Sequence, residues 1–180
     1  MNAQTRGLAE RLTDLRESFD RSFVDPPRPP GGATEHLLAI RAADHPYALR
    51  LNETAGLFAD RAVTPLPGPV TALCGVATFR GVIVPVYSLA ALLGRQPRAD
   101  PRWLALVLGA PALAVGFDAL DGHLRLPAEA LVFLAPGSER RGCLSGLATL
   151  PDQQLSVVDL AAVRDTIHVM AAHPKEGEVG

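Results

Sequence analysis

Large apolar residues recur at helical spacing near the start of the chain. The steps between them are four, three, four and four residues, which places all five on one face of a helix. They are Leu8, Leu12, Leu15, Phe19 and Phe23. Asp25-Pro26 ends the pattern, because proline is not tolerated in a helix interior. The spacing therefore predicts an amphipathic helix over residues 1–25.

A proline- and glycine-rich linker is predicted over residues 26–35. The apolar face of the preceding helix needs a partner, because each large side chain gains about 1.5–3 kcal/mol from full burial. Packing against the rest of the chain and docking on another protein both meet this need. The helix carries similar numbers of acidic and basic residues, which makes binding to an anionic membrane the weakest option.

From His36 onward the helical period gives way to short apolar runs broken by polar, Gly and Pro residues. Such runs predict an all-β fold. They cover residues 37–41, 47–51, 82–87, 103–108, 112–117 and 155–158. Two short helices are predicted at 88–93 and 159–166. Pro85 and Pro111 favour edge strands or strand starts, because proline cannot donate a hydrogen bond to a sheet.

The chain also contains an internal repeat. Residues 75–92 align without a gap on residues 146–163, with seven of 18 positions identical. Two further matches occur in the same order, residues 38–51 with 104–116 and residues 64–67 with 125–127. Because the three matches occur in the same order, we predict two similar β-units, about 36–94 and 102–167. A flexible tail is predicted over 168–180. Units of about 60 residues bury little surface alone, so we expect the two to share an interface.

Composition narrows the function mainly by exclusion. The 180 residues hold 17 Lys and Arg against 19 Asp and Glu, and a net charge of -2 lacks the basic excess of a nucleic-acid-binding protein. The only lysine is Lys175, which excludes a P-loop or a Schiff-base lysine from the predicted domain. No His spacing matches a metal motif, and Gly142–Gly146 is not a G-x-S-x-G elbow. We therefore predict a protein that is not an enzyme and that needs no cofactor.

The remaining composition features predict a cytoplasmic protein without direct membrane insertion. The longest uncharged stretches, residues 64–79 and 103–117, are shorter than the roughly 20 residues of a transmembrane helix. Two cysteines without a C-x-x-C pair are typical of a reducing compartment. The charged start of the chain does not resemble a signal peptide.

One charged residue stands out. Arg80 is the only charged position between Ala62 and Gly94, and it follows Phe79 where a turn should join two apolar runs. One interpretation is that Arg80 has no special role, because a turn tolerates a charged residue. Alternatively, Arg80 beside an exposed Phe79 forms part of a binding surface, since Arg and aromatic residues are enriched at interface hot spots. The residues alone favour neither interpretation.

The stretch Gly75-Val-Ala-Thr-Phe-Arg-Gly-Val-Ile-Val-Pro-Val-Tyr-Ser-Leu89 resembles the G-V-x-N-L-R-G-x-I-V-P-V-x-D-L signature of the CheW-like domain family. The resemblance covers about residues 35–166. It implies two small five-stranded SH3-like β-barrels packed together. It also implies a non-catalytic adaptor that couples chemoreceptors to a CheA-type histidine kinase. In this family a groove between the barrels receives the receptor tip, and barrel ends pair with the regulatory domain of the kinase.

The resemblance also assigns roles by matched position. Arg80 matches the motif arginine and would contact a partner, together with Phe79 and Gly81. We expect the groove to be lined by Leu57, Val82 and Val84. The structural positions of the motif are Gly75, Pro85 and Gly146.

Several positions depart from the family pattern. Ser88 stands in place of the motif Asp, Thr78 in place of Asn, and Gly56 where many members have Glu. These departures leave an alternative open: a diverged CheW-like protein that lacks kinase or receptor binding and binds another protein, for example through the N-terminal helix.

Overall fold

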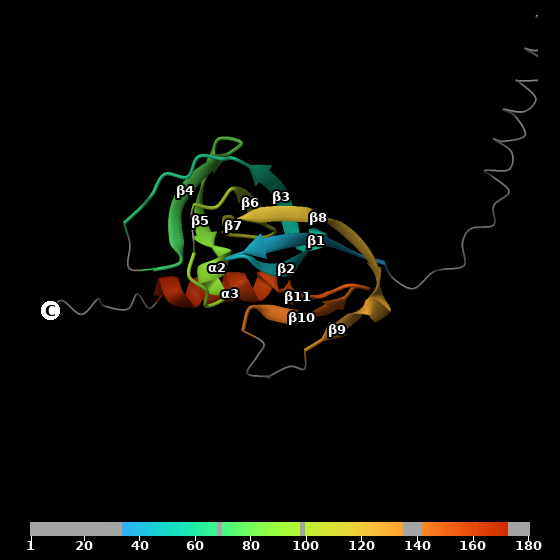
Figure 1. Cartoon of the computed structure of the whole chain (residues 1–180). Helices are drawn as coiled ribbons and strands as arrows, with labels where there is room; N and C mark the ends of the chain where they lie inside the picture. Colours follow the sequence, from blue (N-terminus) through green and yellow to red (C-terminus); the bar gives the residue numbers. More distant parts are fainter. Residues whose placement is uncertain (1–33, 68–69, 98–99, 135–141, 173–180) are drawn as a thin grey trace, which may run out of the picture. The chain divides into compact units, whose positions relative to one another are not determined.

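The computed structural model describes residues 34–67, 70–97, 100–134 and 142–172. These residues form mostly β-structure in two mixed sheets with few helices (Figure 1). The predicted helix over 1–25 lies outside the described residues, as does the predicted linker except for its last two residues.

The elements follow in chain order. The strands are β1 (Thr34–Ala42), β2 (His45–Arg50), β3 (Thr54–Ala59), β4 (Leu73–Phe79), β5 (Val82–Ser88), β6 (Trp103–Val107), β7 (Leu113–Phe117), β8 (Ala119–Pro127), β9 (Leu131–Phe133), β10 (Leu144–Thr149) and β11 (Gln154–Val158). The helices are α2 (Leu89–Leu92) and α3 (Leu160–Ala172), with 3-10 turns η1 (Leu51–Glu53) and η2 (Ala128–Ala130).

The strand order is β8-β1-β2-β11-β10-β9 in the six-stranded sheet and β3-β6-β7-β5-β4 in the five-stranded sheet. Within the described residues the outer strands of each sheet do not pair with each other, so the prediction of two five-stranded SH3-like barrels is corrected to two open sheets, one of six strands and one of five. In the six-stranded sheet the outer strands β8 and β9 are joined by the chain through η2 instead of by hydrogen bonds. The ladder of β9 is made to β10.

The internal repeat corresponds to matching parts of the two sheets. Residues 75–92 form most of β4, then β5 and α2, and residues 146–163 form most of β10, then β11 and the first turn of α3. Both hairpins have a register shift directly before the repeated glycine. Both helices begin after a side-chain cap, with Ser88 and Asp159 accepting from backbone N–H groups three residues later.

Each repeat contributes its first hairpin to the sheet of the other repeat. The β1–β2 hairpin joins β8–β11, and the β6–β7 hairpin joins β3–β5. The order β1-β2-β11-β10 in one sheet therefore matches β6-β7-β5-β4 in the other, and each sheet has one parallel pair at the equivalent place, β2 with β11 and β7 with β5. The two predicted units thus depend on each other for their sheets.

Buried apolar residues form three clusters, one belonging to each sheet and a larger one that both sheets share. Leu37 and Ala39 belong to the cluster of the six-stranded sheet, whereas Leu38 and Ile40 belong to the shared cluster. Side chains alternate between the two faces of a strand, so β1 is buried on both faces. This explains why residues 37–40 are a continuous apolar run instead of an alternating one.

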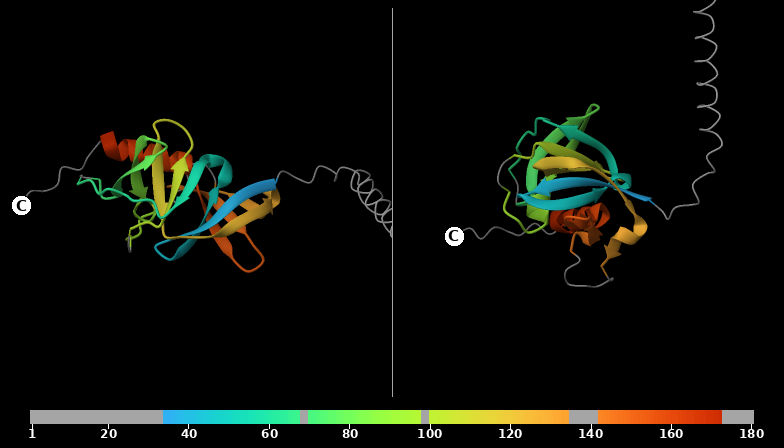
Figure 2. Two further views of the ribbon diagram at one scale, coloured as in Figure 1. Left: turned by 90° about the horizontal axis from the view of Figure 1, so that it is seen from above. Right: turned by 45° about the vertical axis from the view of Figure 1, so that its right-hand side comes forward.

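Two local predictions are corrected. Pro85 lies inside β5, between β4 and β7, and not at an edge. It is tolerated because its partner on β4, Val76, bonds outward to Thr64, and the ladder to β7 begins only at Val86. Helix α3 continues to Ala172, so residues 168–172 are helical and not part of a tail. Figure 2 shows α3, in red, alongside the strands of the five-stranded sheet, although it follows β11.

Candidate protein-binding surface

Arg80 lies at the tip of the β4–β5 hairpin. Phe79 pairs with Val82, which leaves Arg80 and Gly81 as a two-residue turn with φ values of 50° and 83°. Such a turn requires the left-handed region at both central positions. Glycine reaches this region without strain, but a left-handed conformation costs a residue such as arginine about 1 kcal/mol. Arg80 therefore occupies a position where Asn or Gly would make the protein more stable.

The guanidinium of Arg80 is exposed and makes no hydrogen bond or ion pair with any residue in the described ranges. Next to it, Val82 is 57% exposed and Ile83 is 70% exposed. An unpartnered cation beside two exposed β-branched side chains forms a surface that we call the hairpin tip, comprising Arg80, Val82 and Ile83. Arginine with adjacent apolar surface is typical of protein interfaces.

A shallow hollow continues from the hairpin tip along β4. Its volume is ≈ 360 Å³. It is lined by Arg61, Ala62, Thr64, Val76, Ala77, Thr78 and Ile83. Strand β4 is the last strand of its sheet, and Thr64 covers it only at Val76. The edge beyond Val76 is thus open beside the hairpin tip.

The internal repeat supplies a comparison within the same molecule. The equivalent tip, between β10 and β11, has the sequence Pro151-Asp152-Gln153-Gln154 where the first repeat has Arg80-Gly81-Val82-Ile83. The polar tip is what a solvated hairpin needs. The first repeat has a cation and exposed apolar side chains at this tip instead.

Two of the residues predicted to bind partners are buried instead. Phe79 is 4% exposed and Val84 is 1% exposed, and both belong to the cluster of the five-stranded sheet. The register explains this, because residues that alternate with the exposed Thr78 and Ile83 face the core. Leu57 is half-buried against the shared core. The groove predicted from Leu57, Val82 and Val84 is therefore not formed by these three residues.

Phe79 has a packing role that also accounts for Gly56. The centres of the Phe79 and Phe58 rings are 4.8 Å apart. The guanidinium of Arg61 lies 5.6 Å from the centre of the Phe58 ring and 5.9 Å from that of the Phe79 ring. A Cβ on Gly56 would lie 2.9 Å from the Phe58 ring. Phe58 therefore occupies the space that a glutamate side chain at position 56 would need.

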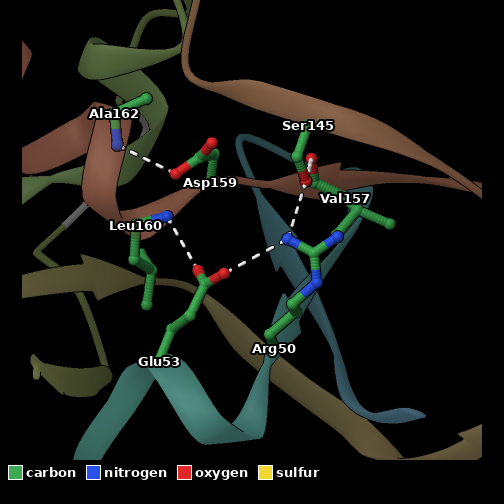
Figure 3. A network of polar contacts seen from close by, with 7 residues as sticks. All are labelled: Arg50, Glu53, Ser145, Val157, Asp159, Leu160 and Ala162. Atoms are coloured by element: carbon green, nitrogen blue, oxygen red, sulfur yellow. Dashed lines mark hydrogen bonds and ion pairs between the residues drawn. The ribbon is translucent and has the colours of Figure 1, made fainter. Parts of the chain in front are cut away.

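A polar network joins η1 to α3 and β10, and sequence reasoning did not find it (Figure 3). The carboxylate of Glu53 accepts from the backbone N–H of Leu160 at 3.0 Å and from the guanidinium of Arg50 at 3.2 Å. Arg50 also donates to Ser145 Oγ at 3.1 Å and lies 5.3 Å from the centre of the Phe133 ring. The network thus connects the crossover between the sheets with the start of α3.

A groove lies beside this network, between η1, the β6–β7 turn and α3. Its volume is ≈ 290 Å³. It is lined by Asn52, Glu53, Val107, Leu108, Leu160, Ala161, Arg164 and Asp165. The guanidinium of Arg164 on α3 stabilises the β6–β7 turn by donating to the backbone oxygens of Val107 and Ala110. Leu108 is 58% exposed. The groove is therefore a partly apolar depression where elements of both sheets meet.

The two repeated glycines are sites of close backbone approach. A Cβ on Gly75 would collide with the carbonyl group of Thr64, and a Cβ on Gly146 would collide with the carbonyl oxygen of Val132. Thr64 and the strand β9 lie at equivalent places beside β4 and β10. Gly75 and Gly146 thus have the structural role expected of small residues at a close contact.

Two side chains in the described ranges have a pKa shifted by burial. Burial, and secondarily the Asp100 carboxylate, raises the pKa of the Cys74 thiol, which disfavours its thiolate form. Burial also raises the pKa of Tyr87. Within the described ranges no three or more His, Cys, Asp and Glu side chains group as metal ligands. None of the helices there has the length and apolar content to cross a membrane.

The exposed, cation-bearing hairpin tip and the partly apolar groove beside Glu53 are the two candidate sites for binding another protein. A sequence profile described as the CheW-like domain matches residues 36–167, and the chain belongs to the CheW-like domain family.

Among solved structures, the scaffolding protein TtCheW from Thermoanaerobacter tengcongensis has a similar fold, with a TM-score of 0.62 and 18% sequence identity. The match covers 70% of this chain and 89% of that chain. No curated protein sequence matches this chain.

Proposed function

We propose that this protein is an adaptor that couples chemoreceptors to a CheA-type histidine kinase, with the hairpin tip as its contact to the regulatory domain of the kinase. The observation that carries the proposal is the unpartnered Arg80 between a buried Phe79 and the exposed Val82 and Ile83. The strained backbone of Arg80 supports it, because the fold itself would be served better by Asn or Gly.

Substitution of Arg80 should separate binding from folding. Arg80→Asn should raise the free energy of unfolding by up to about 1 kcal/mol, because Asn tolerates a left-handed turn, and should weaken kinase binding. Arg80→Glu should weaken binding about tenfold or more. Isothermal titration calorimetry with the isolated regulatory domain measures binding, and urea denaturation measures stability.

Arg95→Glu is the matched control, since Arg95 is an exposed arginine that does not lie in the hairpin tip. It should leave kinase binding unchanged. Full binding of Arg80→Glu to both the kinase domain and a receptor tip would refute the role of Arg80.

The second part of the proposal is that the receptor tip binds in the groove beside Glu53. It is apolar at Val107 and Leu108, and it lies where both sheets meet. Leu108→Glu should place a charge at an apolar contact and weaken binding to a receptor-tip peptide about tenfold or more, with kinase binding retained. The side chain of Leu108 is exposed, so the fold should persist. Equal losses for both partners would contradict the separation of the two surfaces.

The alternative is a CheW-like protein with a different partner, and Gly56 and Ser88 motivate it. Failure of the unaltered chain to bind both the kinase domain and the receptor tip would favour this alternative. Deletion of residues 1–33 then discriminates further. Loss of stability would indicate that this segment packs on the domain, whereas loss of partner binding alone would indicate docking on the partner.

A further inference from the structure

Two exposed histidines meet on neighbouring strands of the six-stranded sheet, far from the hairpin tip in sequence. His36 lies on β1 and His123 on β8. Nδ1 of His36 and Nε2 of His123 are 3.1 Å apart. The ring centres are 5.2 Å apart, and the ring planes differ by 13°. The strand register positions the pair, since Leu38 is opposite His123 and Arg125 is opposite His36.

This spacing is close to that of two imidazoles on one metal ion. With metal–nitrogen bonds of about 2.0–2.1 Å, two ligand nitrogens lie about 2.8–3.4 Å apart over the range from square to tetrahedral geometry. The distance between Nδ1 and Nε2 falls inside that range. An ion could therefore replace the hydrogen bond between the rings once the rings turn so that both nitrogen lone pairs point at it.

The chemistry of the pair selects the class of ion. Neutral imidazole suits Cu²⁺, Ni²⁺ and Zn²⁺, and Cu²⁺ binds such nitrogen ligands most tightly. No third His, Cys, Asp or Glu in the described ranges joins the two rings, so water must complete the coordination. The nearby carboxylate of Asp121 is held by Arg41 at 3.0 Å. Arg125 adds a positive charge that opposes a cation. The site is thus exchangeable and not a structural metal centre.

We propose that His36 and His123 form a labile two-histidine site for a late first-row divalent ion, with Cu²⁺ as its tightest ligand. A bound ion would link β1 to the edge strand β8 by a bond additional to their backbone ladder. Because the ion binds only when the two strands are paired, it would stabilise the folded domain in proportion to its occupancy.

The test uses the untagged full chain and Cu²⁺ alone, at about pH 7.5, where imidazole is largely neutral. Titration calorimetry should show one ion per chain, and the electron paramagnetic resonance spectrum should show two nitrogen ligands. His36→Ala and His123→Ala should each weaken binding about tenfold or more, because a second ligand on the same surface acts intramolecularly. Arg125→Ala should strengthen binding.

His45→Ala and His168→Ala are matched controls on exposed histidines elsewhere in the described residues, and both should bind Cu²⁺ as the unaltered chain does. Circular dichroism verifies that each variant is folded. A single-nitrogen spectrum, or Cu²⁺ affinity unchanged by His36→Ala and His123→Ala together, would overturn the proposal. Neither result depends on the kinase or the receptor, so this test is separate from that of the proposed function.

Discussion

Gly75→Ala is expected to lower the free energy of unfolding by about 2–4 kcal/mol, the upper range for a single substitution. Two causes act together. A Cβ at this position would lie 2.9 Å from the Cα of Pro65 and still closer to the carbonyl group of Thr64, which is backbone and cannot rotate away. In addition, the φ of Gly75 is +149°, a conformation that residues with a Cβ rarely adopt. Urea denaturation followed by circular dichroism measures the loss.

Two other glycines separate these causes. Gly146→Ala retains only the close approach, since a Cβ there would meet the Val132 carbonyl oxygen and lie 3.2 Å from the Cα of Phe133. Gly122→Ala retains only the backbone cause, since its φ is +158° and nothing lies within 4 Å. We expect the order of destabilisation to be Gly75 first, Gly146 second and Gly122 last. A loss for Gly75→Ala no larger than for Gly122→Ala would show that the Thr64 contact is unimportant.

The internal repeat was the part of the fold most accessible from sequence. Equivalent hairpins, the register shift before Gly75 and Gly146, and the caps at Ser88 and Asp159 all fall at aligned positions. These features are local, so similar sequence produces them twice. Similarity does not say which hairpins pair with each other, however. The exchange of the β1–β2 and β6–β7 hairpins between the sheets depends on contacts between residues far apart in the sequence. The same is true of the unpaired outer strands that leave each sheet open.

In the candidate site, too, only the features carried by a single position or a local pattern were predictable from the sequence. Arg80 was visible as a lone charge in an apolar stretch, because charge is a property of one position. The burial of Phe79 depends on which face of β4 meets the core, and a two-residue turn fixes that face. Glu53 with Leu160, and His36 with His123, are 107 and 87 residues apart, and no spacing rule relates them.

Glu53→Ala is expected to lower the free energy of unfolding by about 2 kcal/mol, which is less than the loss for a fully buried ion pair because the site is partly exposed. The side chains of Arg50 and Glu53 are 13% and 25% exposed. Removal of the carboxylate leaves the Arg50 guanidinium with Ser145 and the Phe133 ring, and it deprives the Leu160 N–H of its acceptor. Arg102→Ala is the control, because the pair of Arg102 with Asp60 is exposed and should contribute about 0–1 kcal/mol.

A double-mutant cycle tests whether the network acts through its unpaired charge. Arg50→Met combined with Glu53→Gln replaces the ion pair by neutral side chains, and the amide oxygen of Gln can still accept from the Leu160 N–H. We expect the double variant to lose less stability than the sum of the two single variants, since no charge is left unpaired. Simple additivity would mean that Arg50 and Glu53 contribute independently. In that case the connection from η1 to α3 would rest on the Leu160 hydrogen bond alone, and Glu53→Gln by itself should be nearly neutral.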